Sequence, residues 1–191
     1  MSSALGAIAE RHRVRADLYA AIGRLLRHPL GPDDLAVLRA VLARHPGEEE
    51  GADGIRPLRL LRALVAAPDL AAARREYRAR LVPDSVDLAC EGSYSAVPDA
   101  AYQAVGLNAS ADKVRELEVL AALNQRAAEA ALRGDTPEAQ RLDALECRYL
   151  SAHARACLDT LAGQLRKEDG FYGKVGLVLE TLLEDESLPS P

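Results

Sequence analysis

The residues whose types could do chemistry gather between Leu88 and Leu123. A polar loop of small residues, 90–95 (CEGSYS), interrupts sequence that is otherwise typical of helices. Four carboxylates lie in this loop or shortly after it, at Glu91, Asp112, Glu116 and Glu118. Because carboxylates form strong, charge-assisted hydrogen bonds with cationic groups, this segment suits recognition of a basic partner.

The same carboxylates also have a purely structural interpretation. Asp112 and Glu116 are four residues apart, so a helix that begins near Ser110 places them on one face. Acidic residues at a helix start commonly cap the first N–H groups and interact favourably with the helix dipole. Without further context, the structural interpretation is preferred.

Metal or catalytic chemistry has less support in the sequence. His153 and Cys157 share a helix face, but Cys147 points elsewhere, so the local spacing does not form a three-ligand site. Both cysteines are better explained as small buried hydrophobic side chains. We predict no catalytic residue, no metal and no cofactor; the alternative is a small helical metal- or cofactor-handling enzyme that uses Asp112, Glu116 and His153. The remaining histidines lie in polar or proline-flanked sequence and suggest no catalytic role: His12, His28 and His45.

The elements that must position these residues are helices. Hydrophobic residues make up 49% of the 191-residue chain, with no Trp, one Phe and one Met, so residues that favour strands are scarce. The length fits one domain with a sizeable core. The net charge of −5 argues against a general nucleic-acid binder. The lack of an apolar run long enough for a membrane span or a signal peptide predicts a cytoplasmic protein.

Apolar spacing, prolines and glycines predict about eight helices and no strand of useful length. The expected helices cover residues 5–26, 35–43, 57–66, 70–81, 98–105, 110–133, 136–165 and 171–183. We therefore predict an all-α, single-domain helical bundle at residues 1–185, with a flexible tail at 186–191. The arginines of the fourth helix are interpreted as a solvated basic face: Arg74, Arg75, Arg78 and Arg80.

Six short segments occur along the chain in a characteristic order, and each is similar to the pattern given in parentheses after it. They are Arg15, Tyr19 and Ile22 (R-x-x-x-Y-x-x-[LI]), 90–94 (Y-E-S-x-Y), 102–107 (Y-x-x-x-G-L), 112–120 (D-H-x-x-x-E-L-x-F-[ML]), 149–157 (F-L-x-x-H-L-x-x-W) and 171–176 (F-Y-x-x-x-[GA]). These patterns, in this order, are those of the TorD/DmsD/NarJ family of chaperones that mature molybdenum-containing oxidoreductases, which the chain therefore resembles. Two departures from the family patterns matter. Asp112, or Lys113 after a one-residue shift, replaces the histidine of an Asp-His pair, and Cys157 replaces a tryptophan.

The resemblance implies a TorD-like, non-catalytic cytoplasmic chaperone, as a monomer or a helix-swapped dimer. Its partner is the apo catalytic subunit of a molybdopterin-dependent oxidoreductase, which it holds, often by the twin-arginine signal peptide, until the cofactor is inserted. Because such a signal peptide carries two arginines followed by an apolar helix, a protein that binds it needs carboxylates beside an aliphatic groove. The predicted client-binding residues are Glu91, Ser93, Tyr94, Tyr102, Asp112, Glu116, Leu117 and Glu118. No nucleic acid and no stable membrane insertion are expected.

Overall fold

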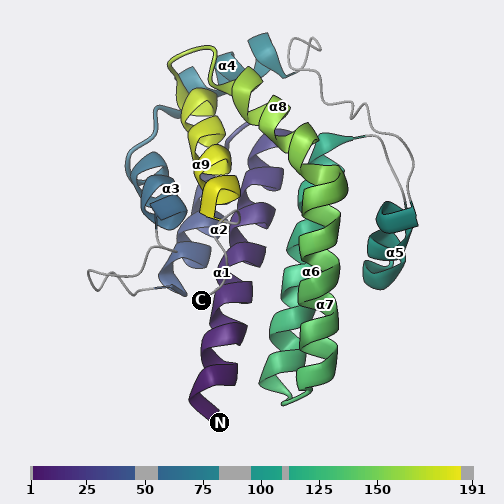
Figure 1. Ribbon diagram of the computed structural model, residues 1–191. Helices are drawn as coiled ribbons and strands as arrows, with labels where there is room; N and C mark the ends of the chain where they lie inside the picture. Colours follow the sequence, from purple (N-terminus) through teal and green to yellow (C-terminus); the bar gives the residue numbers. More distant parts are fainter. Residues whose placement is uncertain (1, 46–55, 82–95, 109–111, 186–191) are drawn as a thin grey trace. The chain divides into compact units, whose positions relative to one another are not determined.

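The computed structural model describes residues 2–45, 56–81, 96–108 and 112–185, and the regular elements in those ranges are all helical (Figure 1). The elements are α1 (Ser2–Arg27), α2 (Pro32–Ala43), α3 (Arg56–Ala66), α4 (Leu70–Arg80), α5 (Ala96–Val105), α6 (Lys113–Leu132), α7 (Thr136–Tyr149), the π-helical segment η2 (Leu150–Ala154), α8 (Arg155–Leu165) and α9 (Phe171–Asp185). The predicted all-α class is confirmed. The expected helix at 136–165 is divided by η2, which the sequence pattern did not predict.

The chain divides into two compact units, each built from two separate segments. Unit 1 comprises residues 1–23 and 89–157, and unit 2 comprises residues 24–88 and 158–191. The predicted single domain over residues 1–185 stays a prediction, and the predicted tail lies outside the described residues. In those residues, no helix combines the length and apolar character that crossing a membrane requires.

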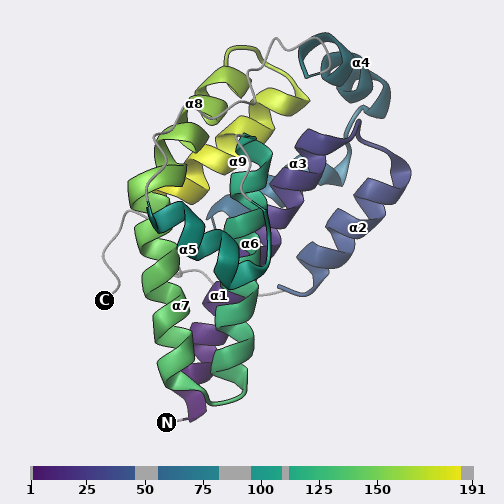
Figure 2. The same cartoon turned by 90° about the vertical axis from the view of Figure 1, so that its right-hand side faces the viewer.

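In unit 1, α5, α6, α7 and η2 pack together, and the N-terminal part of α1 lies alongside α6 and α7 (Figures 1 and 2). The inward face of α6 carries an aliphatic stripe, in which Leu117, Leu120 and Leu123 are fully buried. Removing this stripe from water provides the main driving force that holds the helices together. The same face also carries buried polar side chains, Glu116 and Asn124, and these create the polar sites described below.

Local signals define the ends of the unit 1 helices as the sequence predicts. Gly106, with φ +72°, follows α5, and Gly134, with φ +76°, follows α6, in the left-handed conformation that glycine adopts without strain. Asp135 then caps α7, because its carboxylate accepts a hydrogen bond from the Glu138 backbone N–H at 3.2 Å. These local contacts fix the turns that bring α5, α6 and α7 together.

Unit 2 contains α2, α3, α4, α9 and most of α8. Within it, Arg80 of α4 differs from the prediction made from the sequence. Arg75 and Arg78 are exposed, as expected for a solvated basic face, but Arg80 is buried. Its guanidinium donates to the backbone carbonyls of Gln164 and Leu165 at 2.9 and 3.0 Å. The solvated interpretation is therefore wrong for Arg80, because the last carbonyls of α8 need donors and this side chain supplies them.

Candidate functional site

A buried carboxylate, Glu116, lies at the centre of unit 1 and is contacted from three neighbouring elements. Its side chain is 0% exposed. Tyr102 of α5 donates a hydrogen bond to Oε1 at 3.0 Å, and Tyr149 of α7 donates one to Oε2. His153, in η2, brings its Nε2 to 3.4 Å from Oε2. We call these four residues the Glu116 cluster.

The cluster satisfies a charge that would otherwise be costly to bury. A carboxylate out of water is tolerated only with several hydrogen-bond donors or a cation, and two hydroxyls and an imidazole take that role. Burial raises the pKa of the Tyr149 hydroxyl above its usual range, and the negative charge of Glu116 raises it further. The Tyr149 ring also packs against its neighbours, edge-on to Tyr102 at 6.2 Å and tilted to His153 at 5.5 Å.

Chemically, the cluster contains a carboxylate, two phenols and an imidazole, which are the groups used in proton transfer. Tyr102 and Tyr149 are buried, and His153 is 14% exposed. Both tyrosine hydroxyls donate to the carboxylate, so their protons are engaged within the protein. The cluster is therefore arranged as a structural centre of unit 1.

The predicted client-binding residues separate into three groups. Tyr102, Glu116 and Leu117 are buried in the described structure, and their role in client binding stays a prediction. The burial of Glu116 follows from helical register: Glu116 lies four residues before Leu120, on the face that packs inward. Asp112 and Glu118 keep some exposure. Glu91, Ser93 and Tyr94 lie outside the described residues.

Asp112 and Glu118 have local partners that match the structural interpretation. Asp112 is the N-cap of α6, and its Oδ1 accepts from the Val114 backbone N–H at 2.9 Å. Glu118 pairs with Arg115 at 2.6 Å, one helical turn earlier. Capping and a partly exposed ion pair account for both carboxylates without a ligand, and neither role prevents an additional contact with a cationic partner.

Asp112, Glu116 and His153, the residues proposed for the alternative enzyme, do not form a metal-ligating group. Glu116 and His153 meet, but Asp112 caps its helix. Among the described residues, the group whose ligand atoms lie within 4.8 Å of one another is instead His12, Asp143 and Glu146. The expectation that both cysteines are buried is also wrong for Cys147, which is exposed.

This second group lies between α1, α6 and α7 and was missed by the sequence analysis. His12 Nδ1 is 2.7 Å from the Asn124 side-chain oxygen, and the Asn124 amide nitrogen is 3.0 Å from Glu146 Oε1. His12 Nε2 lies 3.3 Å from Asp143 Oδ1, and this contact lowers the pKa of the Asp143 carboxyl. The signal was available, because His12 continues the spacing of the buried residues Ala9 and Ala16. A polar residue within an apolar stripe indicates a buried partner.

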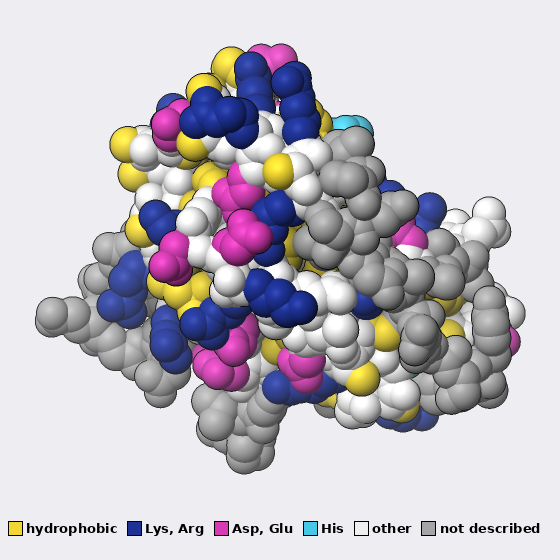
Figure 3. Space-filling model, turned by 90° about the horizontal axis from the view of Figure 1, so that it is seen from above, with side chains coloured by type: hydrophobic (Ala, Val, Ile, Leu, Met, Phe, Trp, Pro, Cys, Tyr) yellow, Lys and Arg dark blue, Asp and Glu magenta, His cyan; other side chains and the backbone are white. Residues whose placement is uncertain are grey.

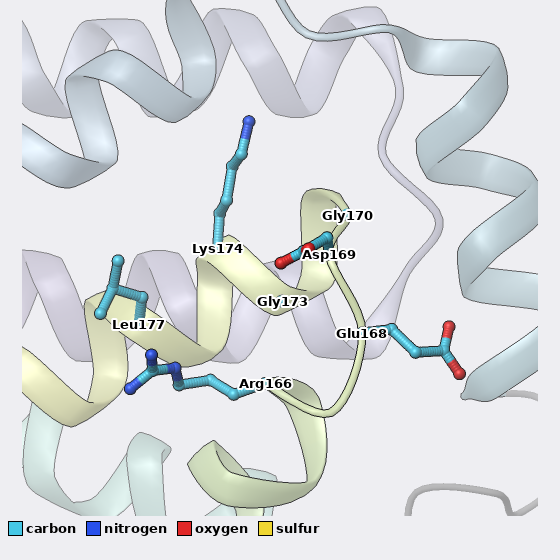
Figure 4. Close-up of a pocket in the computed structure, with 7 residues that line it drawn as sticks. All are labelled: Arg166, Glu168, Asp169, Gly170, Gly173, Lys174 and Leu177. Carbon is cyan, nitrogen blue, oxygen red and sulfur yellow. The ribbon is translucent and has the colours of Figure 1, made fainter.

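The surface offers a weaker candidate. A pocket of about 390 Å³ lies at the turn between α8 and α9, where Arg166, Lys174, Glu168 and Asp169 surround it (Figure 4). Arg166 is engaged by Glu180 of α9, and the remaining charges are of both signs. On the face seen in Figure 3, basic and acidic side chains are similarly interspersed. Because both signs of charge are present, neither the pocket nor this face favours an anionic over a cationic ligand.

No family model, no curated protein and no solved structure matches this chain. Its functional assignment therefore depends on its own residues.

Proposed function

We propose that this protein is a client-specific chaperone of the TorD/DmsD/NarJ type, which binds the apo catalytic subunit of a molybdopterin-dependent oxidoreductase. In this proposal the chaperone performs no catalysis, and it holds its client in the cytoplasm while the cofactor is inserted. The client's twin-arginine signal peptide is the expected contact.

One observation carries the proposal: three separate motifs that resemble this family supply the Glu116 cluster. Tyr102 belongs to the segment at residues 102–107, and Glu116 belongs to the segment at residues 112–120. Tyr149 and His153 both belong to the segment at residues 149–157. They meet in one place through the contacts at Oε1 and Oε2 of Glu116. Motifs that are individually weak gain support when their polar residues depend on one another, because a chance match has no reason to converge.

Two further motif positions have structural roles that fit the same interpretation. Arg15, from the first motif, lies 3.8 Å from the buried Glu146 carboxylate. Gly176, from the last motif, lies where an added Cβ would come within 2.8 Å of the Leu165 Cβ. The buried Glu146 carboxylate needs a cation such as Arg15, and the close approach of Leu165 needs a glycine at position 176. The motif residues therefore have structural roles in this fold, which supports the resemblance.

The proposed client site consists of two carboxylates near the start of α6, Asp112 and Glu118, together with the polar segment at residues 90–95. Glu91, Asp112 and Glu118 would provide negative charge for two arginines, together with the polar side chains of Ser93 and Tyr94. An arginine guanidinium forms paired hydrogen bonds with a carboxylate, whereas a lysine ammonium does not. The proposed site should therefore distinguish arginine from lysine in the peptide.

Calorimetric titration of the full chain with a synthetic peptide tests this site. The peptide carries two adjacent arginines followed by an apolar helical segment, and its control has both arginines replaced by lysines. We expect measurable binding of the arginine peptide and at least about tenfold weaker binding of the lysine peptide, a difference of about 1.4 kcal/mol. Equal affinity for the two peptides, or no binding of either, would contradict the proposal.

Charge reversal separates the proposed site from general electrostatic attraction. Glu91→Arg should weaken binding of the arginine peptide. Glu138→Arg, a matched reversal at a partly exposed position on α7, should leave it unchanged. If both reversals weaken binding equally, attraction to the net charge of −5 explains the binding and the site is wrongly placed.

A further inference from the structure

His12, Asp143 and Glu146 place three metal-ligand types at one point between α1 and α7. The imidazole Nε2 and one oxygen of each carboxylate lie within 4.8 Å of one another. One of these separations, His12 Nε2 to Asp143 Oδ1, is 3.3 Å. Two ligand atoms held about 2.0–2.1 Å from a tetrahedral ion are separated by roughly 3.3 Å, so this pair is already at the required spacing.

Asn124 orients the histidine so that its ligand atom faces the carboxylates. The Asn124 amide nitrogen donates to the Leu120 carbonyl and to Glu146 Oε1, both at 3.0 Å. Its side-chain oxygen is thereby left to accept from His12 Nδ1 at 2.7 Å. A neutral His12 then has its proton on Nδ1 and its lone pair on Nε2. Metal-binding histidines typically donate their other ring N–H to an oxygen acceptor in this way.

Two atoms of this group are buried without a hydrogen-bond partner among the described residues. These are His12 Nε2 and Glu146 Oε2, and each residue is 1% exposed. Buried polar atoms in native proteins are normally satisfied. A metal ion bound between His12 Nε2 and the carboxylates would satisfy both atoms.

Two arginines border the group and compete for its carboxylates. Arg11 lies 3.6 Å from Asp143, and Arg15 lies 3.8 Å from Glu146. Their side chains are 38% and 19% exposed, so both guanidinium groups have a route to solvent when a divalent ion takes their place.

We propose that His12, Asp143 and Glu146 bind one divalent transition-metal ion, with Zn²⁺ as the preferred member of the class. One imidazole and two carboxylates match the ligands of Zn²⁺, whereas Ca²⁺ and Mg²⁺ prefer sites made of oxygen alone. The three residues leave a fourth position for water. The ion would tie α1 to α7 within unit 1, with Asn124 as a positioning residue on α6. This inference goes beyond the proposed chaperone function and is independent of it.

Zinc titration of the full chain tests the site, after removal of bound metal with a chelator. A Cys147→Ser background removes the exposed thiol, which otherwise binds zinc on its own. We expect one Zn²⁺ per chain, with affinity reduced at least about tenfold by His12→Gln and by Asp143→Asn. Asn124→Ala should also weaken binding, because it removes the acceptor that orients His12. His153→Gln, at the other histidine cluster, should leave the affinity unchanged.

Cobalt binding provides a second measurement, because it reports on the metal ligands directly even if one of the variants is unstable. Co²⁺ bound to an imidazole and two carboxylates in four-coordinate geometry gives visible absorption bands, and Asp143→Asn should abolish them while helicity by circular dichroism is retained. Absence of stoichiometric Zn²⁺ binding would overturn the proposal. Unchanged affinity in both ligand variants would overturn it as well. Peptide binding is measured separately, so failure of the metal site and failure of the chaperone proposal are distinguishable.

Discussion

Replacing Glu116 should destabilise unit 1 far more than replacing Glu118, a partly exposed glutamate on the same helix. Glu116→Gln keeps the shape of the side chain but removes its charge. The carboxylate accepts from Tyr102 and Tyr149, and the amide can accept in the same way from only one of them. Since a hydrogen bond to a charged group contributes about 1.5–3 kcal/mol, we expect a loss of about that size. Glu116→Ala leaves two buried hydroxyls without an acceptor and should cost roughly 3–5 kcal/mol.

Urea unfolding of the full chain measures this effect, with Glu118→Gln as the matched control. Glu118 is two residues further along α6, and its partly exposed ion pair with Arg115 should contribute less than about 1 kcal/mol. A double-mutant cycle between Glu116→Gln and Tyr149→Phe should give a coupling of roughly 0.5–3 kcal/mol, because the two side chains share a hydrogen bond. Equal losses for Glu116→Gln and Glu118→Gln, or strict additivity in the cycle, would refute the assignment of Glu116 as the centre of unit 1.

Three further predictions follow from close packing and buried polar groups. Gly176→Ala should cost about 1–3 kcal/mol in urea unfolding, because its Cβ would lie 2.8 Å from that of Leu165. The control Gly163→Ala meets nothing within 4 Å and should gain about 0.5–1 kcal/mol; the same sign for both would contradict this. Arg80→Met should cost roughly 3 kcal/mol, since it leaves carbonyls of α8 without donors, and a neutral result would show that water replaces them. The raised pKa of Tyr149 contributes stability below pH 10, which should be lost as the pH rises further; circular dichroism should show a smaller alkaline loss in Tyr149→Phe than in the parent protein.

Local sequence signals predicted most of the helices correctly. The Asp135 cap and the glycines at 106 and 134 each act within a few residues, so the chain alone reveals where α5, α6 and α7 begin or end. The aliphatic stripe of α6 is likewise a property of one helix. The π-helical segment η2 was not predicted, because an extra residue in one turn leaves no distinct pattern in composition.

The polar contacts depended on residues far apart in sequence, which is why the site was only partly predicted. Glu116 was recognised as notable, but its hydrogen-bond partners were not predicted. Its partners Tyr149 and His153 lie 33 and 37 residues away, and only the packing of α6 against α7 and η2 brings them together. Arg80 was misassigned for the same reason, since its carbonyl acceptors lie 84 and 85 residues further along the chain. A long, flexible arginine gives no local sign of whether its guanidinium faces solvent or a helix end.

The most direct measurement for the chaperone proposal is affinity purification of the full chain from its native cells grown under anaerobic respiratory conditions. Mass spectrometry then identifies the co-purified protein, and elemental analysis measures its molybdenum content. The proposal predicts one large catalytic subunit of a molybdenum oxidoreductase, still carrying its signal peptide where it has one, and without molybdenum. Recovery of no such subunit, or of only the mature, molybdenum-loaded enzyme, would contradict it.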